Sequence, residues 1–189
     1  ARIKRAITSS LDAAANLRPA NDPTGPEVLS IERLLCLAEL GIEYVGPYPD
    51  GEFWLWDQVR ITHGDTVRGG GGKTAAARLA KTTASEIYGH IHRLESVSRT
   101  LHGPNGPQVI TCMSPGCLAH IDGRVPGSAR PDYQQGVGIC YLDEREQVHM
   151  SVLPIHDGRL VYAGVTIEGQ DRGDEIAEDI GYPQARSSA

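Results

Sequence analysis

The sequence predicts an α/β fold, with a tendency toward α+β in its C-terminal part. The first observation is a strand–helix–strand pattern, in which residues 58–62 and 85–88 suit short strands and residues 73–83 are rich in helix formers. A connection of this kind is a right-handed crossover, so the two strands are expected to be parallel. The second observation is that residues 94–167 alternate strand-like runs with turn signals, which predicts antiparallel strands after one βαβ unit.

The segment before the βαβ unit is expected to hold two helices and two short strands. Apolar side chains recur near helical spacing over residues 2–17, and Ser30 suits the N-cap of a second helix that Gly41 would end. Residues 42–45 and 53–56 are then predicted to be short apolar strands. The two tryptophans of the latter strand are expected to pack in the core or against a partner rather than to stack on a nucleobase.

The chain after residue 92 begins with a predicted hairpin of residues 94–101 and 108–113. Residues 168–189 are acidic and end in Ser-Ser-Ala, which is typical of a polar tail. The domain organisation is therefore one lobe over residues 1–167 and a tail over residues 168–189. Between the hairpin and the tail, a three-stranded meander is expected over residues 136–142, 147–153 and 159–167.

Length, charge and cysteine content narrow the class of protein. The 189 residues suit one domain or one lobe of a larger one, and the net charge of -6 argues against a general nucleic-acid-binding domain. Four cysteines without a regular spacing favour free thiols in a reducing compartment, which indicates the cytoplasm. No apolar run approaches the length of a membrane span, so no membrane partner is expected.

Three histidines follow the two strands of the βαβ unit. His63 comes directly after the first strand, and His90 and His92 come just after the second. Because ligands bind beyond the carboxyl ends of parallel strands, the three imidazoles are expected to converge at that edge of the sheet. Neutral imidazole binds zinc, iron, manganese and nickel, so this cluster is a candidate metal site. The alternative is that each histidine is an ordinary surface residue.

A run of four glycines precedes the predicted helix. The stretch over residues 69–74 invites comparison with a phosphate-binding P-loop, but that motif requires a glycine where this chain has Val67. Beside a metal site, such a loop could cover a substrate, with Arg68 and Lys73 contacting its phosphate. A solvated, flexible connection is the alternative interpretation.

Two short motifs resemble the last histidine motifs of the calcineurin-like metallophosphoesterases, particularly the phage-type members: residues 63–65 (His-Gly-Asp) and residues 89–92 (Gly-His-Ile-His). The spacer over residues 34–55 and the Ser-Pro-Gly turn at residues 114–116 are similar to segments of the same family. The resemblance runs from residue 1 to about residue 142. The earlier family motifs Asp-x-His, Gly-Asp-x-x-Asp and Gly-Asn-His are absent from the sequence, so the chain resembles the C-terminal half of such an enzyme.

The resemblance implies half of an αββα sandwich and metal-dependent hydrolysis of phosphate esters, as a phosphatase, phosphodiesterase or nuclease. His63 and His90 would ligate one ion of a binuclear centre and His92 the other, the two divalent ions being Mn, Fe, Zn or Ni. Independently of the resemblance, Asp65 is the only nearby carboxylate at a strand end, so it is expected to orient a ligand histidine. An N-terminal half, on a separate chain or a removed segment, would supply the remaining ligands, and the substrate would be a phosphoester such as a nucleotide or nucleic acid. A phage origin would place the enzyme in the host cytoplasm.

Two other functions are compatible with the same residues. Three histidines and one open position suffice for a mononuclear zinc hydrolase, which would bind one metal and act without a second half. A non-catalytic binding or structural lobe would keep the fold and would tolerate the loss of all three histidines.

Overall fold

The structure, a computed structural model, describes residues 17–47, 49–104, 106–121 and 132–169. The chain divides into two compact units, residues 1–47 and residues 48–189. The predicted helix over residues 2–17 lies outside the described residues except for Leu17, and the predicted tail lies outside them from residue 170.

The described part of the first unit contains one short helix, α2 (Ile31–Leu34). Ser30 caps it as predicted, because its Oγ accepts a hydrogen bond from the backbone N–H of Arg33 at 3.3 Å. The prediction that this helix runs to Gly41 was wrong. Cys36 takes a left-handed φ of 51°, and its N–H donates to the carbonyl of Arg33 at 3.2 Å, which ends the helix.

A second chain reversal follows at Gly41, whose φ is 64°. The N–H of Gly41 donates to the carbonyl of Ala38 at 3.1 Å, and the N–H of Ile42 donates to the carbonyl of Leu37 at 2.8 Å. This pair of bonds is the Schellman arrangement that glycine favours after a helical turn. The predicted strand over residues 42–45 is absent, and these residues are irregular.

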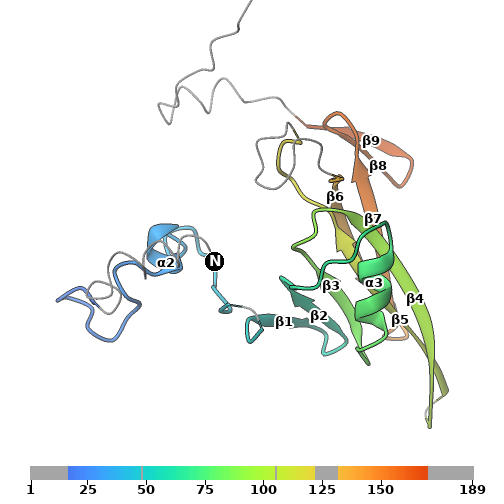
Figure 1. The fold of residues 1–189 in the computed structure, drawn as a ribbon, viewed down its shortest axis with the longest axis horizontal. Helices are drawn as coiled ribbons and strands as arrows, with labels where there is room; N and C mark the ends of the chain where they lie inside the picture. Colours follow the sequence, from blue (N-terminus) through green and yellow to red (C-terminus); the bar gives the residue numbers. More distant parts are fainter. Residues whose placement is uncertain (1–16, 48, 105, 122–131, 170–189) are drawn as a thin grey trace, which may run out of the picture. The chain divides into compact units, whose positions relative to one another are not determined.

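The second unit is built on a mixed five-stranded sheet with the strand order β1-β2-β3-β5-β4 (Figure 1). The β2–β3 and β3–β5 pairs are parallel, and the β1–β2 and β4–β5 pairs are antiparallel. Helix α3 (Lys73–Leu79) connects β2 to β3, which confirms the predicted βαβ unit. The strands are β1 (Glu52–Leu55), β2 (Val59–Thr62), β3 (Ser85–Tyr88), β4 (Leu94–Gly103) and β5 (Gly106–Pro115).

Helix α3 and the hairpin of β6 (Gln135–Leu142) and β7 (Val148–Ile155) cover opposite faces of β5. On the helix side, Figure 1 shows α3 beside β4 and β5, and a buried cluster joins Ala75 and Leu79 of α3 to Ile110 and Cys112 of β5. Met113 points to the other face of β5. There it approaches Gly138 of β6 so closely that a Cβ added at Gly138 would lie 3.0 Å from the Met113 Cε. The core is therefore centred on β5 and lies next to the carboxyl ends of the parallel strands.

The C-terminal strands form two separate hairpins, so the predicted three-stranded meander was wrong. Strands β6 (Gln135–Leu142) and β7 (Val148–Ile155) pair with each other, as do β8 (Arg159–Tyr162) and β9 (Val165–Glu168). The predicted third strand is split because Ala163 and Gly164 have φ values of 50° and 78°, the conformation of a two-residue hairpin turn.

The fold class is mixed α/β, with few helices and one mixed sheet of five strands. The predicted α/β class is confirmed at this level. None of the helices in the described ranges is long and apolar enough to span a bilayer.

Candidate functional site

The loops that follow β2 and β3 meet at one edge of the sheet. The two strands are parallel, so Thr62 and Tyr88, which end them, lie at the same edge in paired register. Gly89 joins the loops, because its N–H donates to the carbonyls of Thr62 at 3.3 Å and His63 at 3.1 Å. An added Cβ at Gly89 would lie 3.5 Å from the His63 carbonyl oxygen and 3.7 Å from the His63 Nδ1, both ordinary van der Waals distances. This contact places the two histidine motifs side by side.

His63 and His90 are in direct contact across these loops. The Nε2 of His63 lies 3.2 Å from the Nδ1 of His90, and the ring centroids are 5.1 Å apart with the planes at 79°. Both residues are exposed at the surface. Two nitrogens bound to one metal at about 2.0–2.1 Å would be roughly 3.0–3.4 Å apart, so this pair fits a shared ion.

The charge environment favours the neutral form of His63. Partial burial of the ring lowers the pKa of His63 below its usual value, and the positive charges that His90 and His92 can carry lower it further. Neutral imidazole is the form that binds metal ions. His63 is therefore neutral near pH 7, as a metal-binding imidazole must be.

His92 is placed differently from the other two histidines. Its ring packs edge to face on Tyr133, with centroids 4.8 Å apart, and its Nδ1 is buried without a hydrogen-bond partner. Within the described ranges, no three or more His, Cys, Asp or Glu side chains form a group that could hold a metal ion. The structure thus brings His63 and His90 into contact, whereas the Nδ1 of His92 is buried and no third ligand joins the pair within the described ranges.

The backbone of the second motif is strained at both histidines. His90 and His92 have φ values of 72° and 58°, which are uncommon for residues other than glycine. The N–H of Ile91 donates to the carbonyl of Gly89 at 2.9 Å, which closes a tight turn around His90. Ile91 is 4% exposed and belongs to the core cluster. The buried Ile91 anchors the turn, and it separates two histidines held in unfavourable backbone conformations.

Asp65 faces α3. Its Oδ1 accepts a hydrogen bond from the Thr66 hydroxyl at 3.1 Å and lies 3.7 Å from the Nη1 of Arg78. Arg78 also packs behind Gly64, where an added Cβ would lie 3.2 Å from the same Nη1. Arg78 thereby supports the loop that carries His63. The predicted role of Asp65 in orienting a ligand histidine stays a prediction.

A buried ion network beneath the site was not foreseen from the sequence. Glu86 of β3 is 1% exposed, and its carboxylate accepts hydrogen bonds from Arg78 and from Arg60, the latter at 2.6 Å. Arg60 and Glu86 lie directly opposite each other in the β2–β3 register. The network could have been predicted by aligning the two parallel strands, because opposite charges at paired positions of adjacent strands commonly interact.

The glycine-rich loop is fixed at both ends. The N–H of Arg68 donates to the Thr74 hydroxyl at 3.0 Å, and the Nη2 of Arg93 donates to the carbonyl of Arg68 at 2.7 Å. Arg93 is itself paired with Glu95 at 3.3 Å. The residues Arg68 and Lys73 are exposed at this end of the sheet, and their predicted contact with a phosphate stays a prediction.

A second buried acid, Glu95 of β4, ties the helix to the end of β3. Its Oε2 accepts hydrogen bonds from the Tyr88 hydroxyl at 3.0 Å and from the backbone N–H of Ala75 at 2.8 Å. Burial and the charge of Glu95 raise the pKa of Tyr88 well above its usual value. Tyr88 therefore remains protonated and donates to Glu95, which holds the residue that immediately precedes the second motif.

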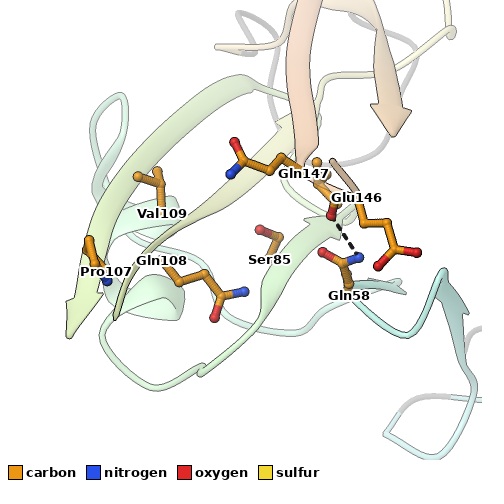
Figure 2. Close-up of a pocket in the computed structure, with 8 residues that line it drawn as sticks. Gln58, Ser85, Pro107, Gln108, Val109, Glu146 and Gln147 are labelled. Carbon is orange, nitrogen blue, oxygen red and sulfur yellow. Dashed lines mark hydrogen bonds between the residues drawn. The ribbon is translucent and has the colours of Figure 1, made fainter. Parts of the chain in front are cut away.

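A pocket lies at the opposite end of the parallel strands (Figure 2). Its volume is about 260 Å³, and Ser85, the first residue of β3, lies at its wall. The amide of Gln58 spans it by donating to the carbonyl of Glu146 at 3.2 Å. Its lining is mostly exposed and polar, and it contains none of the three histidines.

Comparison of the chain with protein-family models, with curated proteins and with solved structures found no match.

Proposed function

We propose that this chain is a lobe of a metal-dependent phosphoesterase that contributes His63, His90 and His92 to a centre of two divalent ions. The observation that carries the proposal is the 3.2 Å contact between the His63 Nε2 and the His90 Nδ1, on adjoining loops at the carboxyl ends of parallel strands. Two imidazoles at this spacing suit one ion, and His92, whose buried Nδ1 has no hydrogen-bond partner, is proposed as the third ligand.

The remaining ligands are proposed to come from an N-terminal half that carries the missing family motifs. His63 and His90 are exposed, which leaves them accessible to oxygen donors from another segment. The edge strand β1 supports a second lobe as well, because Phe53 and Trp54 are 50% and 40% exposed and, among the described strands, β1 pairs only with β2. The mixed sheet would then form one half of an αββα sandwich.

The residues of this chain would bind and orient rather than transfer protons. When bound, two divalent ions would neutralise the charge of a phosphoester and activate a water molecule. The lowered pKa of His63 keeps its ring neutral for binding. Arg68, on the adjoining loop, and Lys73, the first residue of α3, are proposed to contact the phosphate. Candidate metals are manganese, iron, zinc and nickel, all of which accept imidazole and carboxylate ligands.

Two measurements test the proposal. Titration with Co²⁺ or Mn²⁺ is expected to show weak binding by the chain alone, because about half of the ligand set is absent, and His63→Ala, His90→Ala and His92→Ala should each weaken it further. His149→Ala is the matched control, since His149 is an exposed histidine that pairs with Asp143 at 2.9 Å. Adding an N-terminal half that carries the three missing motifs is expected to produce hydrolysis of bis-p-nitrophenyl phosphate.

The outcomes separate the three functions. Hydrolysis that requires the added half and is lost in the three site variants supports the binuclear phosphoesterase. One tightly held ion, with hydrolysis by this chain alone, would instead identify a mononuclear zinc hydrolase. Absence of metal binding by the wild-type chain, with no hydrolysis after the half is added, would leave a non-catalytic lobe.

A further inference from the structure

A short segment, residues 132–135, lies against the end of the second histidine motif. The backbone N–H of Gln134 donates to the carbonyl of His92 at 2.9 Å, and the side-chain Oε1 of Gln134 accepts from the N–H of Leu94 at 3.1 Å. One glutamine therefore bonds to the chain on both sides of Arg93. A side-chain amide in this position replaces the backbone partner that Leu94 would otherwise need.

The same segment is held against the end of β5. The carbonyl of Gln134 accepts from the N–H of Cys117 at 3.0 Å. Gly116 has a φ of +79°, and a Cβ at that position would lie 2.3 Å from the Gln134 oxygen, so the approach requires glycine. The ring of Tyr133, next to Gln134, covers the His92 ring with centroids 4.8 Å apart. His92 is thus fixed through its carbonyl and through its ring.

These contacts supply what the conformation of His92 needs. Its φ of 58° is costly for a side-chain-bearing residue, and such conformations persist where the surroundings hold them. Gln134 reaches the backbone directly after His92, at a point where relaxation of φ would move the imidazole. Loss of the glutamine amide would leave the Leu94 N–H unpaired and would free this backbone to relax.

From these contacts we infer that Gln134 is a positioning residue for the His92 ligand, an inference that rests on the proposed metal site. Gln134 itself is not proposed as a ligand. It sets the backbone conformation that aims the His92 ring, and Tyr133 limits the rotation of that ring. Groups that orient metal ligands in this way typically change metal affinity by about 10–100-fold when they are removed.

The test compares two neighbouring glutamines in the full chain. Gln134→Ala removes the acceptor for Leu94, whereas Gln135→Ala removes a glutamine whose Nε2 donates to the carbonyl of Ala119 at 2.9 Å. Co²⁺ titration, followed by the visible absorption of the bound ion, is expected to show affinity reduced about 10–100-fold in Gln134→Ala only. In the metal-free protein, hydrogen exchange at the Leu94 amide should quicken in Gln134→Ala and stay unchanged in Gln135→Ala.

The possible failures are distinguishable. Wild-type Co²⁺ affinity in Gln134→Ala, or an equal loss in both alanine variants, would overturn the role of Gln134 while leaving the proposed function in place. A wild-type chain that binds no Co²⁺ would overturn the proposed function and the metal role of Gln134 together. Unchanged exchange at Leu94 in Gln134→Ala would overturn the positioning contact, whatever the metal binding.

Discussion

Replacing Glu86 with alanine removes the carboxylate at the centre of the ion network beside the candidate site. The Glu86 side chain is 1% exposed, and it pairs with Arg78, which is 9% exposed, and with Arg60, which is 33% exposed. Arg78 also lies over the Tyr88 ring, with its Cζ 4.9 Å from the ring centroid. The substitution would leave a buried guanidinium without its main acidic partner.

The free energy of unfolding is expected to fall by about 3–5 kcal/mol, the usual cost of removing one partner from a buried ion pair. Most of this cost comes from Arg78, because Arg60 is exposed enough for water to solvate it. A domain is typically stable by roughly 5–15 kcal/mol, so the loss is a large fraction of the total. Glu86→Leu combined with Arg78→Met removes both charges and should recover most of the lost stability.

Chemical denaturation followed by circular dichroism measures these differences. Glu52→Ala is the control, since Glu52 lies 3.6 Å from Arg60 and both side chains are about one-third exposed. Its expected cost is at most about 1 kcal/mol. Two results would refute the interpretation of the network as a buried ion pair in which losing one partner is costly. One is a loss in Glu86→Ala no larger than that of the control, and the other is a double variant less stable than Glu86→Ala itself.

Three further predictions concern a glycine, a thiol and a histidine. Gly116→Ala should destabilise the protein by about 2 kcal/mol or more, because the φ of Gly116 is +79° and a neighbouring carbonyl oxygen would lie 2.3 Å from the new Cβ. Gly103→Ala is the control: its new Cβ would lie in open space, so the Tm should change little. Burial raises the pKa of the Cys112 thiol to about 12, so iodoacetamide at about pH 8 should modify the exposed Cys36 and spare Cys112 until the protein unfolds; equal rates would contradict this. The pKa of His63 is lowered from 6.5, so the unfolded chain binds more protons below that pH, and the metal-free protein should lose stability as the pH falls below it. His63→Gln should weaken this dependence in Tm measurements between about pH 7.5 and 5.5, and an unchanged slope would contradict the lowered pKa.

The βαβ unit could be predicted because each part has a local cause. Residues 73–79 carry helix formers, and the flanking strands are short and apolar or β-branched. Parallel pairing then follows from the helical crossover between the two strands, and it places His63 and His90 at one edge. The direct contact between the two rings is the closest agreement between the predicted site and the structure.

Backbone conformations of single residues explain most of the errors. Cys36 and Ala163 take left-handed φ values of 51° and 50°, although neither residue type favours them. The first shortens the predicted helix, and the second divides the predicted third strand of the meander. Sequence patterns report average propensities, so they miss positions where tertiary contacts impose an unusual φ.

The parts of the site that depend on long-range contacts were also missed. Glu86 and Glu95 are charged residues within strands, and such residues normally indicate a solvent-facing side. Their burial depends on partners such as Arg78 and on a backbone N–H at the start of α3. The contact of Gln134 with Leu94 spans 40 residues in sequence, and no periodicity indicates it.

The strain at His90 differs from the strain elsewhere in the described ranges. Eight non-glycine residues there have positive φ, and the six outside the second motif lie in hairpin turns or at a helix end, where such values reverse the chain. His90 instead follows a parallel strand, and a tight turn from Gly89 to Ile91 encloses it. Strain of this kind gathers at functional sites, where a ring must point in one direction at the expense of stability.

Two substitutions at His90 separate the strain from the loss of the ring. His90→Ala and His90→Gly both remove the imidazole, but only glycine accepts a φ of 72° without cost, so the glycine variant should be more stable by about 1 kcal/mol. Ala76→Gly in α3 is the control of opposite sign, since glycine should cost about 1 kcal/mol in a helix. Denaturant unfolding measures all three. An alanine variant as stable as the glycine variant would mean that His90 is not strained, and the argument from strain to function would fail at that residue.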